Sequence, residues 1–185
     1  DSSPSRGLGD VYKRQLLPGR LKFIKDFSDT SKPVGAAFNN PSLISQDGME
    51  ANTKQWRNAE IPAANGHGTA RSIAKLYGIL ANGGSRDGIH VLKPETIEMS
   101  RLPQSEGKDL VLGGMNTKFG LGFMLGNENI SMGPNIKSFG HGGAGGSLGF
   151  CDPDNHVSLG FVMNQMHPGI TAWKTATDLA SSVYK

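Results

Sequence analysis

A histidine followed by a run of glycines is the part of the sequence whose residue types and spacing could support chemistry. In the segment 138–150, His141 stands directly before Gly142 and Gly143, and two further glycines follow Ala144. Glycine serves here for one of two reasons. It adopts a turn with positive φ, or it leaves room for another backbone or a substrate to approach closely. Either reason makes this segment a candidate site.

The same glycines allow a second interpretation, as a dinucleotide-binding module. Gly140, Gly142 and Gly145 fit the pattern G-x-G-x-x-G. That fingerprint must open a helix, whereas residues 147–151 alternate as in a strand and end at an Asp-Pro pair. The context therefore favours a turn between strands, and the dinucleotide module stays as the less favoured alternative.

Patterns of period two predict an antiparallel sheet around the histidine. Apolar residues alternate with small or polar ones over 118–125, 146–151 and 157–163, and the stretch 137–141 predicts a neighbouring strand. The Asp-Pro-Asp-Asn sequence at 152–155 predicts a hairpin loop between two of them. The strands at 137–141 and 146–151 would position the histidine and its glycines.

Helices are expected before and after these strands. Thr69 caps a predicted helix whose apolar residues recur at three- and four-residue spacing until Asn82 and two glycines end it. A shorter helix is expected over 95–100, after Pro94. At the end of the chain, apolar residues at helical spacing over 170–184 predict a helix that covers one face of the sheet.

The N-terminal third has a different character. Residues 1–15 lack apolar periodicity and resemble a translated linker, so we expect a non-native tail there. Residues 16–66 are rich in Pro, Gly, Asn, Ser and Asp and predict mostly ordered loop. The predicted organisation is thus a tail at 1–15 and the C-terminal part of a single domain at 16–185.

Composition bounds the remaining function classes. The 185 residues are 36% apolar, enough for one core, and the formal net charge is only +3. Lys and Arg are scattered, so no nucleic-acid partner is expected. Cys151 is the single cysteine and is expected to be a small core residue. No stretch approaches the roughly 20 apolar residues of a transmembrane helix, and no metal-ligand spacing is evident, so neither a metal nor another cofactor is expected.

The sequence around His141 resembles the third motif of the β-lactamase-related serine hydrolases, which include class C β-lactamases, penicillin-binding proteins and esterases. In that family a K-T-G or H-x-G triad lies on a sheet strand beside the active-site serine. The matching residues are HGG, AGGSLGF, DPDN and LGFVMN, and upstream EIPAANGHGTARSIAKLYGILANGG is similar to the esterase-like branch. The resemblance runs from about Asn40 to the end. It implies an α+β, β-lactamase/transpeptidase-like fold, present in part: antiparallel strands, a covering C-terminal helix and part of the helical region.

The resemblance also implies roles for residues. His141 takes the first position of the triad and would place a proton donor or a positive charge near the reacting serine. Gly142 and Gly143 would leave the strand edge open to substrate. The backbone N–H of Ala144 would be the second oxyanion-hole donor, a contact worth roughly 3–4 kcal/mol. His67 is a candidate for substrate binding, with an exposed loop histidine as the alternative, and for His141 the alternative is a structural role in its strand.

The nucleophile that the resemblance implies is missing from these residues. The family uses a S-x-x-K motif, in which the lysine activates the serine, and a Y-x-N-type motif. Two S-x-x-K strings occur, but Ser72 and Lys75 fall inside the predicted helix, and Ser105 and Lys108 fall in a predicted polar loop. Neither pair is expected to be catalytic, so we expect the 185-residue chain alone to be inactive.

The implied function is that of a serine hydrolase acting through an acyl-enzyme on a small-molecule ester, β-lactam or amide. Histidine in place of lysine and the NGHGTAR segment favour ester substrates. One alternative is a non-catalytic scaffold or binding member of the same fold. An intact S-x-x-K upstream would favour the enzyme over the scaffold, and nucleotide-dependent thermal stabilisation would identify a dinucleotide module.

Overall fold

The computed structural model describes residues 25–39, 49–127, 132–166 and 174–184. These residues fall into two compact units. The first comprises the described residues up to Gly66 together with Leu110–Gly114, and the second comprises His67–Asp109 and the described residues from Met115 onward. The tail expected at 1–15 lies outside the described residues. In the described part of the chain, no helix is both long and apolar enough to cross a membrane.

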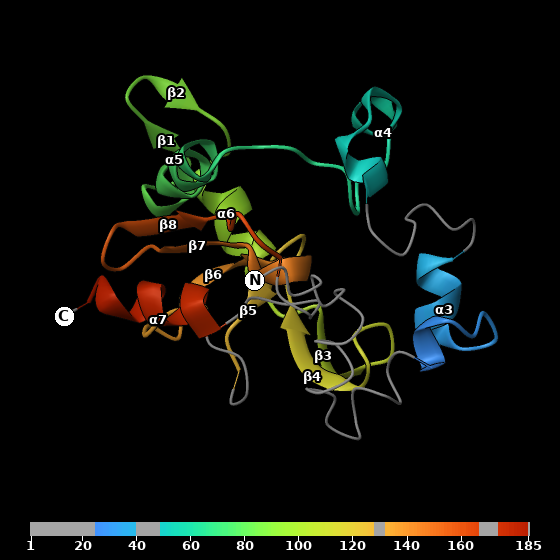
Figure 1. Ribbon diagram of the computed structural model, residues 1–185. Coiled ribbons are helices and arrows are strands. Elements are labelled where there is room, and N and C mark those ends of the chain that lie inside the picture. The colour runs from blue at the N-terminus through green and yellow to red at the C-terminus, as the bar shows by residue number, and fades with distance from the viewer. Residues whose placement is uncertain (1–24, 40–48, 128–131, 167–173, 185) are drawn as a thin grey trace, which may run out of the picture. The chain divides into compact units, whose positions relative to one another are not determined.

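The first unit is more helical than expected. Its helices are α3 (Pro33–Phe38), the 3-10 helix η1 (Met49–Asn52) and α4 (Lys54–Asn58), all seen in Figure 1. Pro33 begins α3, a position that suits proline because the N–H it lacks would have no helical acceptor there. The rings of Phe27 and Phe38 stack with centroids 5.1 Å apart. Thr53 caps α4 by accepting a hydrogen bond from the N–H of the buried Trp56.

The predicted amphipathic helix of the second unit is confirmed as α5 (Ala70–Ala81). Thr69 Oγ1 accepts a hydrogen bond from the Ser72 N–H at 3.1 Å, and Ser72 Oγ accepts one from the Thr69 N–H at 2.9 Å. This reciprocal pair is a capping box and pairs two N–H groups that the helix cannot satisfy itself. The helix ends at Asn82, and Gly84 beyond it has a φ of 86°, a left-handed conformation that favours glycine.

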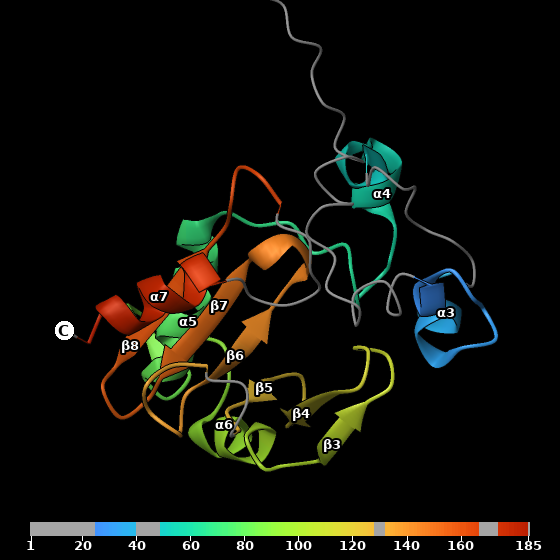
Figure 2. The same ribbon diagram turned by 60° about the horizontal axis from the view of Figure 1, so that its bottom comes forward.

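Six antiparallel strands form one sheet in the order β3-β4-β5-β6-β7-β8, so each strand pairs with the next along the chain (Figure 2). The strands are β3 (Ser105–Asp109), β4 (Met115–Phe119), β5 (Met124–Leu125), β6 (Phe139–Gly142), β7 (Leu148–Asp152) and β8 (Val157–Phe161). The strands predicted before the glycine run, after it and beyond the Asp-Pro-Asp-Asn loop are confirmed as β6, β7 and β8.

A separate two-stranded hairpin lies between α5 and the sheet in the sequence. It consists of β1 (Ser85–Arg86) and β2 (Ile89–His90), and it leads to α6 (Pro94–Ser100). We did not predict this hairpin. Asp87-Gly88 is a typical two-residue turn sequence, with φ of 52° and 77°, but two residues per strand are too few to establish a period. The short helix after Pro94 is confirmed.

The single strand predicted over 118–125 is wrong. The alternation crosses two strands, β4 and β5, and the turn between them is closed by the Gly120 N–H, which donates to the Phe123 carbonyl at 2.9 Å. Gly122 has a φ of 81°, which favours glycine at this turn. Leu121, expected on the buried face of a strand, is 55% exposed.

The polar segment that contains Ser105 and Lys108 is not the loop that we expected. It forms β3, in which Ser105 pairs with Phe119 and Lys108 with Asn116 of β4. Four of its five residues are exposed. Because β3 pairs on one side only and buries little, its sequence carries no alternation of apolar residues.

Apolar side chains pack on both faces of the sheet. One cluster lies on the face toward α5 and α6 and contains Leu80, Ala81, Ile97, Leu125, Phe139 and Cys151. The other lies on the face toward α7 (Lys174–Ser182) and contains Met124, Met132, Leu148, Phe150, Ala176 and Ala180. The second unit therefore has three layers, helix, sheet and helix (Figure 2). The covering C-terminal helix is confirmed, and Ile170 and Trp173 at its predicted start lie outside the described residues.

The buried carboxyl group of Asp152 ties the C-terminal segment to the β7–β8 turn. It is fully buried, and its Oδ2 accepts hydrogen bonds from the Tyr184 hydroxyl and from the Asn155 side-chain amide, both at 2.8 Å. Its Oδ1 accepts from the Asn135 side chain at 2.8 Å and from the N–H groups of Asp154 and Asn155 at 3.0 and 3.2 Å. A buried carboxylate is stable in this setting because donors surround it.

A glycine lets α5 approach β8 closely. A Cβ on Gly160 would collide with the carbonyl oxygen of Ala70 and would lie 2.6 Å from the backbone nitrogen of Ala74, both in α5. The neighbouring Ser158 hydroxyl donates to the Ala74 carbonyl at 3.0 Å. The contact between helix and strand is thus made by backbone atoms, which cannot move aside as a flexible side chain can.

We expect Gly160→Ala to destabilise the chain by about 1–3 kcal/mol, because the added methyl group must push α5 away from β8. The measurement is the free energy of unfolding from chemical denaturation. Gly66→Ala is the matched control, since nothing lies within 4 Å of a Cβ there. Equal loss of stability in the two variants would show that the close approach at Gly160 is not what the glycine provides.

Candidate active site

The expected site residues lie on β6 and on the turn that joins it to β7. Within β6, His141 is the one exposed residue, and Gly142 beside it is buried. His141 pairs with Gly149 and Gly142 with Leu148 across the two strands. The hairpin therefore presents the His141 side chain to the surface at the end of β6.

The glycine run forms the tip of this hairpin. The Gly143 N–H donates to the Ser147 carbonyl at 2.9 Å, and the Gly146 N–H donates to the Gly143 carbonyl at 3.1 Å. Between them lies a single 3-10 turn, η2 (Ala144–Gly146), in which Gly145 has a φ of 83°. This glycine is needed for a left-handed turn. The run joins two strands and opens no α-helix, so the dinucleotide interpretation is wrong.

The His141 ring is held by two contacts. Its Nδ1 lies 2.6 Å from the Gly142 carbonyl oxygen, and its ring centroid lies 6.0 Å from that of Phe119. A carbonyl oxygen only accepts hydrogen bonds, so Nδ1 carries the proton and donates it. The neutral ring then has its free acceptor at Nε2, and the protonated ring has a second donor there.

Ala144 lies exposed at the tip of the turn. The backbone hydrogen bonds that close this turn use the N–H groups of Gly143 and Gly146 and leave out that of Ala144. Gly143 before it has an extended conformation, with φ −131° and ψ 164°. Ala144 is thus an exposed residue, three positions after His141, whose N–H is not used in closing the turn.

Two side chains near this turn were not singled out in the sequence. A Cβ on Gly143 would collide with Ser147 Oγ, so the serine hydroxyl lies directly over the Gly143 backbone. Met166, from the segment after β8, lies in the same way over Gly145. The Met166 contact joins two separate parts of the chain, so no local pattern signals it, whereas Ser147 belongs to the turn itself.

The fifth candidate, His67, belongs to a different segment from the β6–β7 hairpin. It is exposed on the segment that leads into α5, two residues before the Thr69 cap. Its role in substrate binding stays a prediction.

The residues of the two S-x-x-K strings belong to a helix and to an edge strand. Ser72 takes part in the capping box of α5, and Lys75 is exposed on the same helix. Ser105 and Lys108 belong to the edge strand β3. These positions agree with the expectation that neither pair supplies the nucleophile.

Cys151 is a core residue, as expected. Its side chain is fully buried in the cluster beneath α5, and burial raises the pKa of its thiol to about 12. Thiolate is the reactive form, so such a thiol is a poor nucleophile at neutral pH. Among the described residues, no group of three or more His, Cys, Asp or Glu side chains is placed to hold a metal ion.

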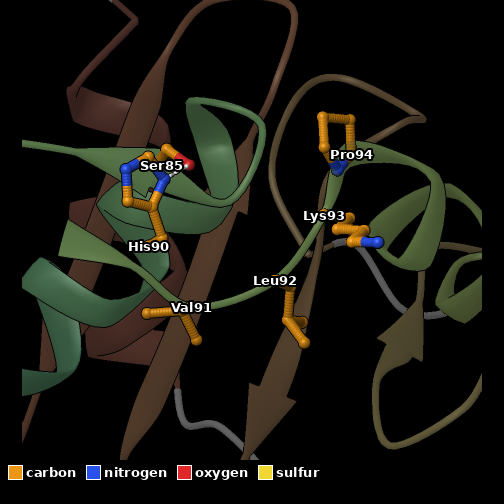
Figure 3. Close-up of a pocket in the computed structure, with 6 residues that line it drawn as sticks. All are labelled: Ser85, His90, Val91, Leu92, Lys93 and Pro94. Carbon is orange, nitrogen blue, oxygen red and sulfur yellow. Dashed lines mark hydrogen bonds between the residues drawn. The ribbon is translucent and has the colours of Figure 1, made fainter. Parts of the chain in front are cut away.

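A pocket of about 320 Å³ lies on the β1–β2 hairpin and the segment that leads to α6 (Figure 3). Its lining residues are Ser85, His90, Val91, Leu92, Lys93 and Pro94. Ser85 Oγ and His90 Nδ1 are 2.7 Å apart, and the two residues are direct partners across the strand pair. The contact therefore joins the two strands, and none of the residues with an expected role lines this pocket.

Comparison with known proteins identifies the family. The family model named Beta-lactamase matches residues 25–181. A curated relative, Esterase/beta-lactamase LipL of Mycobacterium tuberculosis, is 41% identical over 108 residues, which are 58% of this chain and 24% of the relative. The chain thus spans about a quarter of the length of that relative.

Two crystal structures are similar in fold as well as in sequence. A family VIII carboxylesterase is 37% identical with a TM-score of 0.67, and the match covers 76% of this chain and 37% of that one. A penicillin-binding protein homolog from Caulobacter crescentus is 38% identical with a TM-score of 0.70, and the match covers 82% and 39% of the two chains. With the family model matching most of its length, this chain belongs to the β-lactamase family.

Proposed function

We propose that this chain is the C-terminal part of a serine hydrolase that acts on small-molecule esters in preference to β-lactams and amides. The observation that carries the proposal is the β6–β7 hairpin, where His141 and Ala144 are both exposed and lie three residues apart. The names of the similar proteins, an esterase/β-lactamase and a carboxylesterase, support the same class of reaction.

In the proposed reaction, a serine outside these 185 residues attacks the ester carbonyl carbon while its lysine partner takes the proton. The carbonyl oxygen becomes an oxyanion that accepts a hydrogen bond from the Ala144 N–H. The C–O bond to the leaving group then breaks, the alcohol departs with a proton, and an acyl-serine remains. Water attacks the acyl carbon and releases the acid and the free serine.

His141 supplies a proton donor or a positive charge beside the reacting carbonyl. With Nδ1 committed to the Gly142 carbonyl, Nε2 is the atom that faces the substrate. Gly142 is buried and the Ser147 hydroxyl lies over Gly143, so the substrate would meet backbone atoms and the Ser147 hydroxyl at this end of β6. His67 is proposed only as a contact for distal parts of the substrate.

The experiment measures ester hydrolysis by two proteins. One is the longer protein that contains this chain together with a Ser-x-x-Lys motif, and the other is the 185-residue chain. We expect serine-dependent turnover of a p-nitrophenyl ester from the former and none from the latter. His141→Ala is expected to lower kcat by about 10- to 100-fold, because proton transfer or charge stabilisation is lost.

Two variants make this test specific. His141→Lys restores a cationic donor and is expected to retain more activity than His141→Ala, whereas His90→Ala removes an exposed histidine of the β1–β2 hairpin and should change nothing. Wild-type turnover in a folded His141→Ala variant would mean that His141 is structural. Turnover by the 185-residue chain that disappears in Ser72→Ala would overturn the assignment of the nucleophile to another segment.

A further inference from the structure

Met166 is an exposed apolar side chain that lies on the proposed site. It is 67% exposed, among the most exposed large apolar residues of the described chain. A Cβ on Gly145 would lie 2.7 Å from both the Cγ and the Cε of Met166 and 2.9 Å from its Cβ. The whole length of the methionine side chain therefore lies against the Gly145 backbone.

This contact is next to the proposed oxyanion donor. Gly145 follows Ala144 directly, and consecutive Cα atoms are about 3.8 Å apart. Gly145 also has a φ of 83°, so the turn has a left-handed bend at the point where Met166 covers it. A side chain at Gly145 would displace Met166, so glycine at this position leaves the room in which the methionine packs.

The position suits contact with an apolar part of a substrate. Methionine is unbranched and apolar and adapts its shape to what it contacts. One side of Met166 rests on a glycine turn and most of the rest is open to solvent. If the ester carbonyl oxygen binds the Ala144 N–H, the acyl chain starts next to Gly145, the residue that Met166 contacts.

We propose that Met166 determines the preference for the acyl group, by forming an apolar surface for acyl chains longer than acetyl. This inference rests on the proposed function, because it names the specificity residue of that same site. It predicts a preference for butyryl over acetyl esters that depends on the Met166 side chain.

The test measures kcat/KM for p-nitrophenyl butyrate and p-nitrophenyl acetate in the full-length protein that contains this chain. Met166→Ala is expected to lower the butyrate-to-acetate ratio about tenfold, since removing an apolar contact with one or two methylene groups has an effect of this size. Met166→Gln, similar in length but polar, should lower the ratio as well. Met166→Leu, which stays apolar, should keep it within about twofold of the wild type.

Met99→Ala is the control, because Met99 is 59% exposed on α6 and is remote in sequence from the turn. Its ratio should equal that of the wild type. A wild-type protein that hydrolyses both esters, with an unchanged ratio in Met166→Ala and Met166→Gln, would overturn this inference alone. A full-length protein without serine-dependent hydrolysis would overturn the proposed function and this inference with it.

Discussion

Replacing Ala144 with proline is expected to lower kcat for ester hydrolysis about 10²- to 10³-fold in the full-length protein, the usual effect of losing one oxyanion-hole donor. Proline has no backbone N–H, so the substitution removes the proposed donor and nothing else of the hydrogen-bonded turn. The bonds that close the turn come from Gly143 and Gly146 and would remain.

The local backbone accommodates proline at this position. A residue before proline prefers an extended conformation, and Gly143 already has φ −131° and ψ 164°. Ala144 is the first residue of the 3-10 turn η2, where a missing N–H breaks no bond within the turn. Ala144→Ser keeps the N–H and is the matched control, with near wild-type kcat expected. A folded Ala144→Pro variant with wild-type kcat would exclude Ala144 as the donor.

Asp152→Asn is expected to destabilise the chain by about 3 kcal/mol at neutral pH. The substitution keeps the side-chain volume but places an amide group where Oδ2 now accepts from the Tyr184 hydroxyl and the Asn155 amide. At least one buried donor is then left without an acceptor, and each such group costs about 1–3 kcal/mol. The measurement is the free energy of unfolding from chemical denaturation.

The same contribution should depend on pH. Burial raises the pKa of the Asp152 carboxyl, but hydrogen bonds from Asn155, Tyr184 and Asn135 lower it more, so that the net pKa is below its ordinary value of 3.8. A carboxyl group whose pKa is lower in the folded state stabilises the fold above its unfolded pKa. That stability is lost as the pH falls from the ordinary value of 3.8 through the lower folded pKa, so the difference between wild type and Asp152→Asn should shrink over this range and vanish only below the folded pKa.

Asp154→Asn provides the control in the same turn. Asp154 is exposed and forms an ion pair with Lys137 at 3.1 Å, a type of contact that contributes little to stability. Its removal should leave the unfolding free energy nearly unchanged. An equal loss in the two variants, or a difference between wild type and Asp152→Asn that does not shrink as the pH is lowered below 3.8, would contradict the role of the buried carboxylate.

The elements that were predictable from the sequence carry their signals locally. Thr69 and Ser72 mark the start of α5, and the glycines after Asn82 mark its end, so this helix could be located without its neighbours. The β7–β8 hairpin likewise has its turn residues between two alternating runs. For these elements the backbone conformation follows the pattern of the nearest few residues, although β7 is buried at all five residues and β8 is half-buried throughout.

The elements that were missed depend on tertiary context. Apolar residues alternate without a break from β4 through the turn at Leu121 into β5. The pattern therefore looked like one strand, although the backbone turns between the two. The edge strand β3 has polar side chains throughout, since one neighbour is enough to hold its backbone. Strand propensity and the alternation of apolar residues both reflect burial. A short or exposed strand therefore shows neither signal in its sequence.

Some residues of the candidate site could be predicted from the sequence and others could not. His141 and Ala144 were indicated by a contiguous motif, and the structure places them together at one hairpin because they are close in sequence. Met166 was not indicated, because its contact with Gly145 arises only when a separate part of the chain folds onto the turn. Ser147 lies within the motif itself, but its contact with Gly143 depends on the conformation of the turn.

The two edges of the sheet differ in chemical character. The edge strand β3 contains Glu106, Lys108 and Asp109, and Glu106 forms an ion pair with Lys118 of β4 at 3.3 Å. The opposite edge strand, β8, has the sequence VSLGF and no charged residue. Charged side chains on an edge strand discourage pairing with strands of other molecules. The charges of β3 therefore protect that edge, whereas β8 has none and is instead packed against α5.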